Sequence, residues 1–418
     1  MLVFSHQAAG GIVLGNAGFT KEASRIIETA EKSVLTGDTA RALNTLQLLA
    51  NQPDTLAPDV MLFQLMAEAG MREQAKKHLE QFTVRSSPRF DTFLAFSRMA
   101  VLEKRWFDAF VHGQLALRQP TPDNWSEEFS EKMKLEALLV LMESSEARGS
   151  WAQVREAIQM CDVEKASDPR LLHFLAKVEL FDGNMEKAEE RFRVFSRALP
   201  EQPAPLVLIA EEYVMKGDSQ NAELFFRKAC DEKDPQVAGL AKLKMAAWLI
   251  DQNRIEHAER TLADIDIPAS KEIDALLLRV IIHRSRQEFD RAQQILTGLR
   301  LRTKDNFAVN NQLALVLSCS QLQEEQEEAL DLAAANAKQF PGVPDAFATL
   351  GWTNLVVGNL QAAERNLTAS TSTGIISRDT AFYFSELYER LGEKNQAERM
   401  RSAARDGQGP FIFAQRIK

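Results

Sequence analysis

A phrase that repeats about every 34 residues constrains this chain more than any other feature of its sequence. In a clear copy, Gly183 is followed by Ala188 and then, four positions further on, by the large apolar Phe192. Successive anchor positions lie 33 to 37 residues apart, except for one spacing of 45. The anchors are Ala42, Ala75, Ala109, Val154, Ala188, Ala222, Ala258, Ala292, Ala329, Ala363 and Ala397. Such a period predicts a stack of similar units instead of the two or three globular domains that 418 residues would otherwise suggest.

Each anchor is preceded by a second apolar stripe, so every unit is expected to contain two helices. Leu172, Leu175 and Ala176 form one such stripe, and residues three and four positions apart lie on one helical face. The pattern therefore predicts a helix A, a short turn and a helix B that form an antiparallel hairpin. Thirteen of the 14 prolines lie between one B helix and the next A helix, where proline is tolerated, and only Pro410 lies outside these joints.

Small residues mark the positions where these helices are expected to cross. Ala176, Ala210 and Gly351 occupy one place in helix A, and only a small side chain there admits the backbone of a neighbour. Because one hairpin cannot bury its apolar stripe alone, each unit should stack on the next. The composition agrees with a folded helical protein, with 45% hydrophobic and 26% charged residues and too few glycines and prolines for a turn-rich β-sandwich.

This pattern resembles the tetratricopeptide repeat, whose unit has a leucine followed by a small residue in helix A, a glycine-to-alanine step and a terminal proline. The resemblance covers Ala23 to Gly407 and is most specific from Pro169 to Arg401. It implies an all-α fold, a right-handed superhelical solenoid of about eleven hairpins. Val154, where the family has alanine, is a departure from the pattern.

We expect one solenoid body over residues 20–406, with a terminal segment on either side. Residues 1–19 are apolar and glycine-rich and have no basic residue before Lys21, so they are interpreted as a cap, the start of a fragment or a weak signal-like segment. No membrane span is expected. Residues 407–418 form a tail whose apolar side chains, Phe411, Ile412 and Phe413, could fold back over the last unit, dock on a partner or lead into a further domain. We expect the first.

The 45-residue spacing between Ala109 and Val154 places an insertion at about residues 119–134. Insertions in solenoids emerge as loops or helix extensions along one edge. Trp125 and Phe129 are therefore candidate exposed contacts for a partner. The alternative is that both side chains bury a lengthened helix against its neighbour.

The residues that could perform chemistry show no catalytic or metal-binding pattern. The net charge of −9 argues against non-specific binding to nucleic acid or anionic lipid. Cys161, Cys230 and Cys319 are too far apart for a paired metal-ligand motif, and the six histidines show no ligand spacing. We therefore expect no catalytic residue, no cofactor and no metal.

The resemblance implies that the A helices line a concave face that receives a peptide or an extended protein segment. Candidate groove residues lie fifteen or eleven positions before the anchors: Arg98, His173, Lys177, Leu243, Leu277, Ile281, Trp352 and Phe382. No three successive units reproduce the lysine and asparagine clamp with which some members hold a chain-terminal carboxylate. A hydrophobic or mixed segment is the better expectation. Alternatively, the apolar members of this set pack between adjacent A helices and leave no open groove.

These features together predict a non-enzymatic scaffold or adaptor that binds a protein or peptide partner, with no nucleic acid partner. We expect it in the cytoplasm. One alternative is an envelope or export-linked assembly protein whose array lies outside the cytoplasm, for example in the periplasm. Another is the regulatory region of a larger multidomain protein. The sequence leaves the partner and the oligomeric state open.

Overall fold

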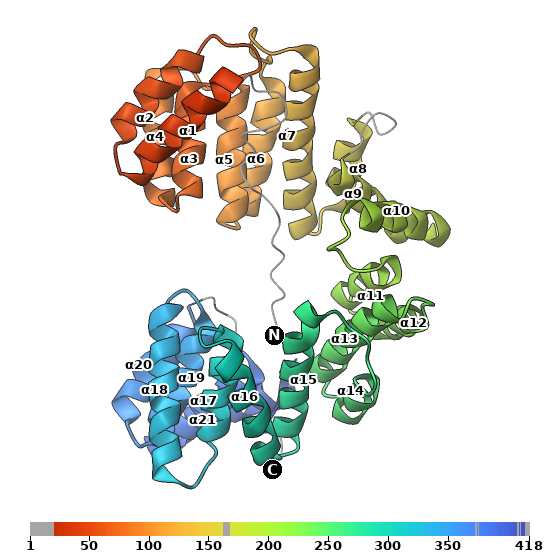
Figure 1. The fold of residues 1–418 in the computed structure, drawn as a ribbon, viewed down its shortest axis with the longest axis vertical. Coiled ribbons are helices and arrows are strands. Elements are labelled where there is room, and N and C mark those ends of the chain that lie inside the picture. The colour runs from red at the N-terminus through yellow and green to blue at the C-terminus, as the bar shows by residue number, and fades with distance from the viewer. Residues whose placement is uncertain are drawn as a thin grey trace. The chain divides into compact units, whose positions relative to one another are not determined.

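The computed structural model describes residues 21–161, 168–372, 374, 376–407, 409 and 411–413. These residues form 22 α-helices and two short 3-10 helices, without any strand (Figure 1). The predicted all-α class is thus confirmed. The expectations for residues 1–19 lie outside the described residues. None of the described helices is long and apolar enough to cross a membrane.

The chain divides into two compact units, with the boundary between Gln202 and Pro203. Their helices alternate strictly between the A and B positions of successive hairpins. The N-terminal unit contains α1 (Lys21–Leu35), α2 (Thr39–Leu46), η1 (Gln47–Leu49), α3 (Pro58–Glu68), α4 (Arg72–Arg85), α5 (Phe90–Leu102), α6 (Trp106–Arg118), α7 (Glu127–Ala147), α8 (Trp151–Gln159), α9 (Pro169–Phe181) and α10 (Met185–Ala198).

The C-terminal unit continues the same alternation over its own stack of hairpins. It contains α11 (Pro205–Met215), α12 (Ser219–Cys230), α13 (Pro235–Asp251), α14 (Ile255–Thr261), η2 (Ala269–Lys271), α15 (Glu272–Ser285), α16 (Phe289–Arg302), α17 (Phe307–Leu317), α18 (Gln323–Gln339), α19 (Pro344–Val356), α20 (Leu360–Ser370), α21 (Arg378–Arg390) and α22 (Lys394–Asp406).

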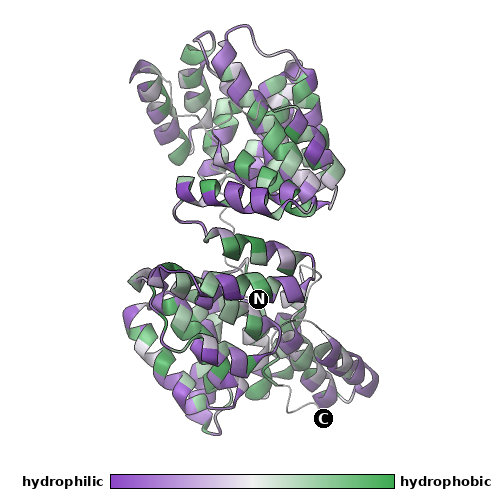
Figure 2. Ribbon diagram, turned by 90° about the vertical axis from the view of Figure 1, so that its right-hand side faces the viewer, coloured by the Kyte–Doolittle hydropathy of each residue, from purple (hydrophilic) through white to green (hydrophobic). Residues whose placement is uncertain are grey.

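The eleven predicted anchors all lie on B helices, the even-numbered α2 to α22, and each of them is completely buried. Helix A meets helix B at small residues, as expected. At Gly351 of α19, an added Cβ would lie only 2.6 Å from Leu367 Cγ on α20. Figure 2 shows hydrophobic and hydrophilic residues together on most helices, as amphipathic hairpins that stack on both neighbours require. Within each unit, successive hairpins therefore pack on one another through equivalent positions of the repeat.

The ends of the helices follow local rules. Proline occupies the first turn of α3, α9, α11, α13 and α19, where its missing N–H removes no helical hydrogen bond. The turn from helix A to helix B needs a left-handed residue, which glycine supplies at Gly183 and Gly217 with φ of 81° and 74°. Where a unit lacks this glycine, Asn253 and Gln287 adopt the same conformation, with φ of 56° and 61°. The hairpin geometry thus persists where the repeated glycine is missing.

The tail folds back on the last unit, which confirms the expectation for its apolar residues. Phe411, Ile412 and Phe413 are each less than a tenth exposed and pack with side chains of α19 and α21. The Ile412 N–H donates to Asp379 Oδ1 at 3.1 Å. Arg378, the first residue of α21, donates from Nη1 to the Gly409 carbonyl of the tail at 3.2 Å. These bonds fix the tail to the start of α21.

Candidate partner-binding surfaces

The two basic candidates of the N-terminal unit are engaged in ion pairs between successive A helices. Arg98 Nη2 on α5 lies 2.8 Å from Glu136 Oε2 on α7, and Lys177 Nζ on α9 lies 2.6 Å from Glu146 Oε1 on α7. Arg170 also donates to Glu136, at 2.6 Å. Burial favours protonation of Glu136, but the hydrogen bond from Arg170 and the charge of Arg98 outweigh it and lower the pKa of this carboxyl. These cations therefore connect hairpins.

His173 packs among aromatic rings of its own hairpin. Its ring centroid lies 4.9 Å from that of Phe195 and 5.7 Å from that of Phe192, both on α10. A third neighbour, Phe174, lies on α9 beside it. His173 therefore belongs to the interior of the α9–α10 hairpin.

The five apolar candidates of the C-terminal unit are also inside the fold. Leu243, Leu277, Ile281, Trp352 and Phe382 are all less than a tenth exposed. The Trp352 ring stacks on Tyr383 with centroids 4.6 Å apart, and Phe382 stacks on Phe413 of the tail at 4.7 Å. These five side chains therefore pack within the chain. They do not line an open apolar groove.

The two aromatic side chains of the insertion pack against the preceding hairpins, Trp125 buried and Phe129 partly buried. Trp125 is only 8% exposed, and its Nε1–H donates to the Thr55 carbonyl at 2.8 Å. Its ring meets Phe90 and Phe129 edge-on, with centroids 5.7 Å and 5.0 Å apart. Helix α7 begins directly after it and runs for 21 residues. Of the two interpretations, burial against the neighbouring helices describes Trp125.

Polar groups of the insertion reach back to the loop before α3. Asn124 Nδ2 donates to the Gln52 carbonyl at 2.9 Å, and the Asp54 N–H donates to the Asn124 carbonyl at 2.9 Å. The Ser126 N–H and hydroxyl both donate to the Asp54 carboxylate. We name this set of residues the insertion staple: Asp54, Asn124, Trp125 and Ser126. It joins segments about 70 residues apart and was not predicted from the sequence.

A buried arginine on α15 is the least expected polar feature of the C-terminal unit. Arg284 is 1% exposed, and its Nη1 donates to Gln312 Oε1 on α17. Its Nε and Nη2 are buried and have no hydrogen-bond partner among the described residues. On the adjacent α17, Asn311 Oδ1 is likewise buried without a donor in the described part of the chain.

Helix α21 lies close enough to Arg284 for its charge to act on two groups there. Burial raises the pKa of Asp379 to about 6, and Arg284 opposes this rise without cancelling it. Burial, reinforced by the charge of Asp379, also raises the pKa of Tyr383. We name Arg284, Asn311, Gln312, Asp379 and Tyr383 the inner polar cluster. It combines one cation that has unused donors with one acceptor that has no donor.

Sequence reasoning missed Arg284, although the repeat contained a signal for it. The residue lies eight positions before its anchor, Ala292. In seven of the eleven units this position is apolar, and Arg284 is the only cation in the row. The row consists of Val34, Ala67, Val101, Glu146, Leu180, Val214, Ile250, Arg284, Gln321, Leu355 and Glu389. A cation at this position occurs in one unit alone and marks that unit as different.

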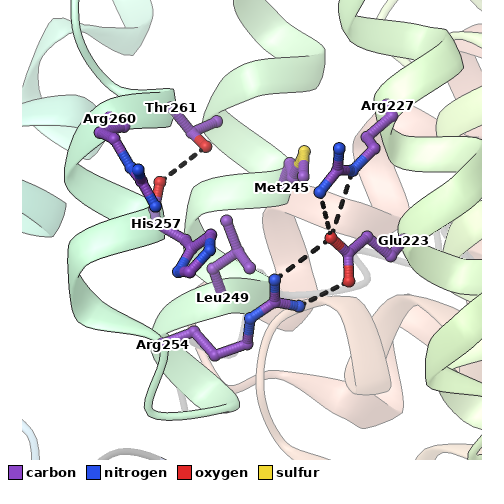
Figure 3. Close-up of a pocket in the computed structure, with 8 residues that line it drawn as sticks. All are labelled: Glu223, Arg227, Met245, Leu249, Arg254, His257, Arg260 and Thr261. Carbon is purple, nitrogen blue, oxygen red and sulfur yellow. Dashed lines mark hydrogen bonds and ion pairs between the residues drawn. The ribbon is translucent and has the colours of Figure 1, made fainter.

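A surface pocket of about 420 Å³ lies between α12, α13 and α14 (Figure 3). Glu223 is at its edge and accepts hydrogen bonds from Arg254 at 2.6 Å and Arg227 at 2.7 Å. The hydrogen bond from Arg254, and to a lesser extent that from Arg227, lowers the pKa of Glu223 to about 2. The other lining residues are Met245, Leu249, His257, Arg260 and Thr261. The carboxylate of Glu223 and the guanidinium groups of Arg227 and Arg254 are thus already paired with one another. The ion pair between Glu223 and Arg254 connects one hairpin to the next.

Two of the three cysteine thiols are shifted away from their reactive, ionised form. Burial raises the thiol pKa of Cys161 and of Cys230 to about 11, so both are protonated at neutral pH. His283 Nδ1 lies 2.7 Å from Glu288 Oε2 in a helix turn. Within the described ranges, no group of three or more His, Cys, Asp or Glu side chains could hold a metal ion.

The described residues form an array of eleven antiparallel helical hairpins. No model of a known protein family matches its sequence, and no curated protein does. Among solved structures, it is similar to a human IFIT1 dimer with PPP-AAAA, with 15% identity, 78% of this chain and 79% of that chain covered, and a TM-score of 0.41.

Two further solved structures are similar at lower scores. The APC/C hetero-tetramer Cut9-Hcn1 has 11% identity, covers 92% of this chain and 79% of its own, and gives a TM-score of 0.36. PilW, a type IV pilus biogenesis factor, has 15% identity, covers 60% of this chain and 97% of its own, and gives a TM-score of 0.29. The described residues themselves show the architecture, because their 22 α-helices form eleven hairpins.

Proposed function

We propose that the protein is a non-enzymatic scaffold that binds a segment of a partner protein along the A helices of its C-terminal unit. The observation that supports this is the set of unused polar atoms in the inner polar cluster, namely Arg284 Nε and Nη2 and Asn311 Oδ1. Buried polar groups in folded proteins are nearly always hydrogen-bonded. A polypeptide segment supplies the carbonyl, N–H and carboxylate groups that would complete them.

The proposal that no reaction is catalysed follows from the state of the candidate nucleophiles and bases. A thiol with a raised pKa is a poor nucleophile at neutral pH, and this applies to Cys161 and Cys230. Burial lowers the pKa of His112, which removes its charge without placing a nucleophile beside it. A scaffold uses none of these groups chemically.

We place the protein in the cytoplasm in this proposal. Its three cysteines are half-buried and none forms a disulfide among the described residues, which suits a reducing compartment. With a net charge of −9, the expected partner is a protein segment, not nucleic acid.

Site-specific photo-crosslinking tests the binding face. A photoreactive amino acid at Gln312, on A helix α17, should yield a covalent adduct with a partner in cells. The control position is Leu301, which lies on B helix α16 and is 78% exposed. Adducts from Leu301 but none from Gln312 would place the binding surface on the B helices and refute this part of the proposal.

A further inference from the structure

We infer that Arg284 binds a carboxylate group of the partner segment. This inference rests on the proposed function and specifies the chemistry that the inner polar cluster recognises. It comes from the state of one guanidinium group, which is charged, buried and only partly hydrogen-bonded.

The unused edge of Arg284 has the geometry that a carboxylate requires. Its Nη1 is occupied by Gln312, whereas Nε and Nη2 are both without a partner among the described residues. The N–H bonds of Nε and Nη2 point in parallel from one side of the planar group, so together they can donate to both oxygens of a carboxylate. A neutral carbonyl offers a single oxygen, which could meet both donors only in a shared, less linear geometry and which brings no opposite charge. The free pair therefore favours a carboxylate over a peptide carbonyl.

The burial of Arg284 strengthens its preference for a carboxylate over a neutral carbonyl. An arginine remains protonated in a protein interior, and a buried charge without an opposite charge in contact is strongly destabilising. Asp379 is near enough to interact with it, but Asp379 Oδ1 already accepts the Ile412 N–H and its raised pKa reflects burial that Arg284 does not offset. A bound carboxylate would supply the missing contact.

Other arginines of this unit show what a completed contact looks like. Arg286, two residues further along the chain, donates from Nη1 and Nη2 to the two oxygens of Glu259 at 2.6 Å and 2.7 Å. Arg302 forms the same two-oxygen contact with Glu272. Arg284 is the buried counterpart that has no such carboxylate within the described part of the chain.

The direct test observes the Arg284 Nε–H resonance by NMR while acetate replaces chloride at constant ionic strength. The resonance is assigned as the one that disappears in Arg284→Gln. A saturable shift of this resonance is expected, without a comparable shift of Arg286, which is already paired with Glu259. No shift of Arg284 on addition of acetate would overturn the inference, whether or not the protein binds a peptide.

Peptide selection then separates this inference from the proposed function and identifies the source of the carboxylate. Wild type, Arg284→Gln and the control Arg286→Gln are each screened against short random peptides, made once with a free carboxyl terminus and once with a carboxamide. Wild type and Arg286→Gln should select acidic peptides, and Arg284→Gln should bind these about 10- to 100-fold more weakly, as loss of a charge-assisted hydrogen-bond pair implies.

The pattern of selection distinguishes the outcomes. Retained selection in the carboxamide library would assign the carboxylate to an Asp or Glu side chain, whereas its loss there would assign it to the chain terminus. Peptide binding without acidic preference, or with the same preference in Arg284→Gln, would refute carboxylate binding by Arg284 and leave the scaffold function standing. Absence of any peptide binding, together with a shift of Arg284 by acetate, would refute the scaffold function alone. Since Arg284→Gln removes a buried charge, we expect its helicity and Tm to be at least those of wild type.

Discussion

Burial and hydrogen bonding compete at the single side chain of Asp379. Burial raises its pKa to about 6, and Arg284 and the Ile412 N–H, which both favour the carboxylate, only partly oppose the rise. A carboxyl group whose pKa is higher in the folded than in the unfolded state destabilises the fold as it ionises. The penalty is absent below the unfolded value near 3.8 and complete above the folded value near 6. Stability should therefore decline as pH rises through this window.

Asp379→Asn should remove that penalty. The asparagine Oδ1 can still accept the Ile412 N–H, so the tail keeps its hydrogen bond while the buried charge is lost. At pH 7.5 we expect a gain in folding free energy on the order of 2 kcal/mol, falling towards zero near pH 4. Thermal unfolding at several pH values measures it. Asp305→Asn, at an exposed position, is the control, and an equal gain in both variants would contradict the burial argument.

The anchor alanines allow a second prediction at the scale of the residue. Ala222 is completely buried where α12 meets its neighbours, so Ala222→Arg overpacks the crossing at a cost of about 1–3 kcal/mol or more. Hydrogen exchange should increase in α11, α12 and also α13. Gln220→Arg, on an exposed position of the same helix, should leave exchange unchanged. Loss of protection confined to the α11–α12 hairpin would argue against stacking.

At the scale of the element, the insertion staple fixes the start of α7. Trp125→Phe keeps an aromatic ring beside Phe90 but removes the indole donor to the Thr55 carbonyl. Loss of this buried hydrogen bond should cost about 1–3 kcal/mol. Exchange should rise both at the first turn of α7 and in residues 52–57. Trp151→Phe is the matched control, because Trp151 packs on Phe181. Identical effects of the two substitutions would mean that ring volume, not the hydrogen bond, matters.

The same elements show what the sequence could and could not predict. The anchors located all eleven B helices because the crossing of two helices within a hairpin is a local event that each repeat must solve in the same way. The staple escaped prediction because Asn124 and Thr55 lie far apart in sequence and neither belongs to the repeated phrase. The apolar groove positions were ambiguous from the outset, since a side chain that faces the next A helix and one that faces a partner share the same spacing. Trp352 and Phe382 took the first role.

At the scale of the whole molecule, the division at Gln202 predicts two separate responses to core damage. Trp352→Ala removes a buried ring that stacks on Tyr383 and should destabilise the C-terminal unit by about 3–5 kcal/mol. Hydrogen exchange should increase through α19 to α22 and stay unchanged in residues 21–161. Phe107→Ala, at a position 65% exposed, should change neither unit. Increased exchange in both units would mean that they unfold together.

The folded-back tail would also limit the length of the partner segment that we propose. Because Phe411 and Phe413 cover aromatic side chains of α19 and α21, the partner segment that we propose would contact the A helices α11, α13, α15 and α17 of this unit. Packed helices lie about 8–10 Å apart, and an extended chain advances about 3.3 Å per residue. Four such helices therefore measure out a recognition motif of roughly ten residues. In the proposed complex the tail would limit the length of the bound segment at one end, and its removal should lengthen the motif that the protein can bind.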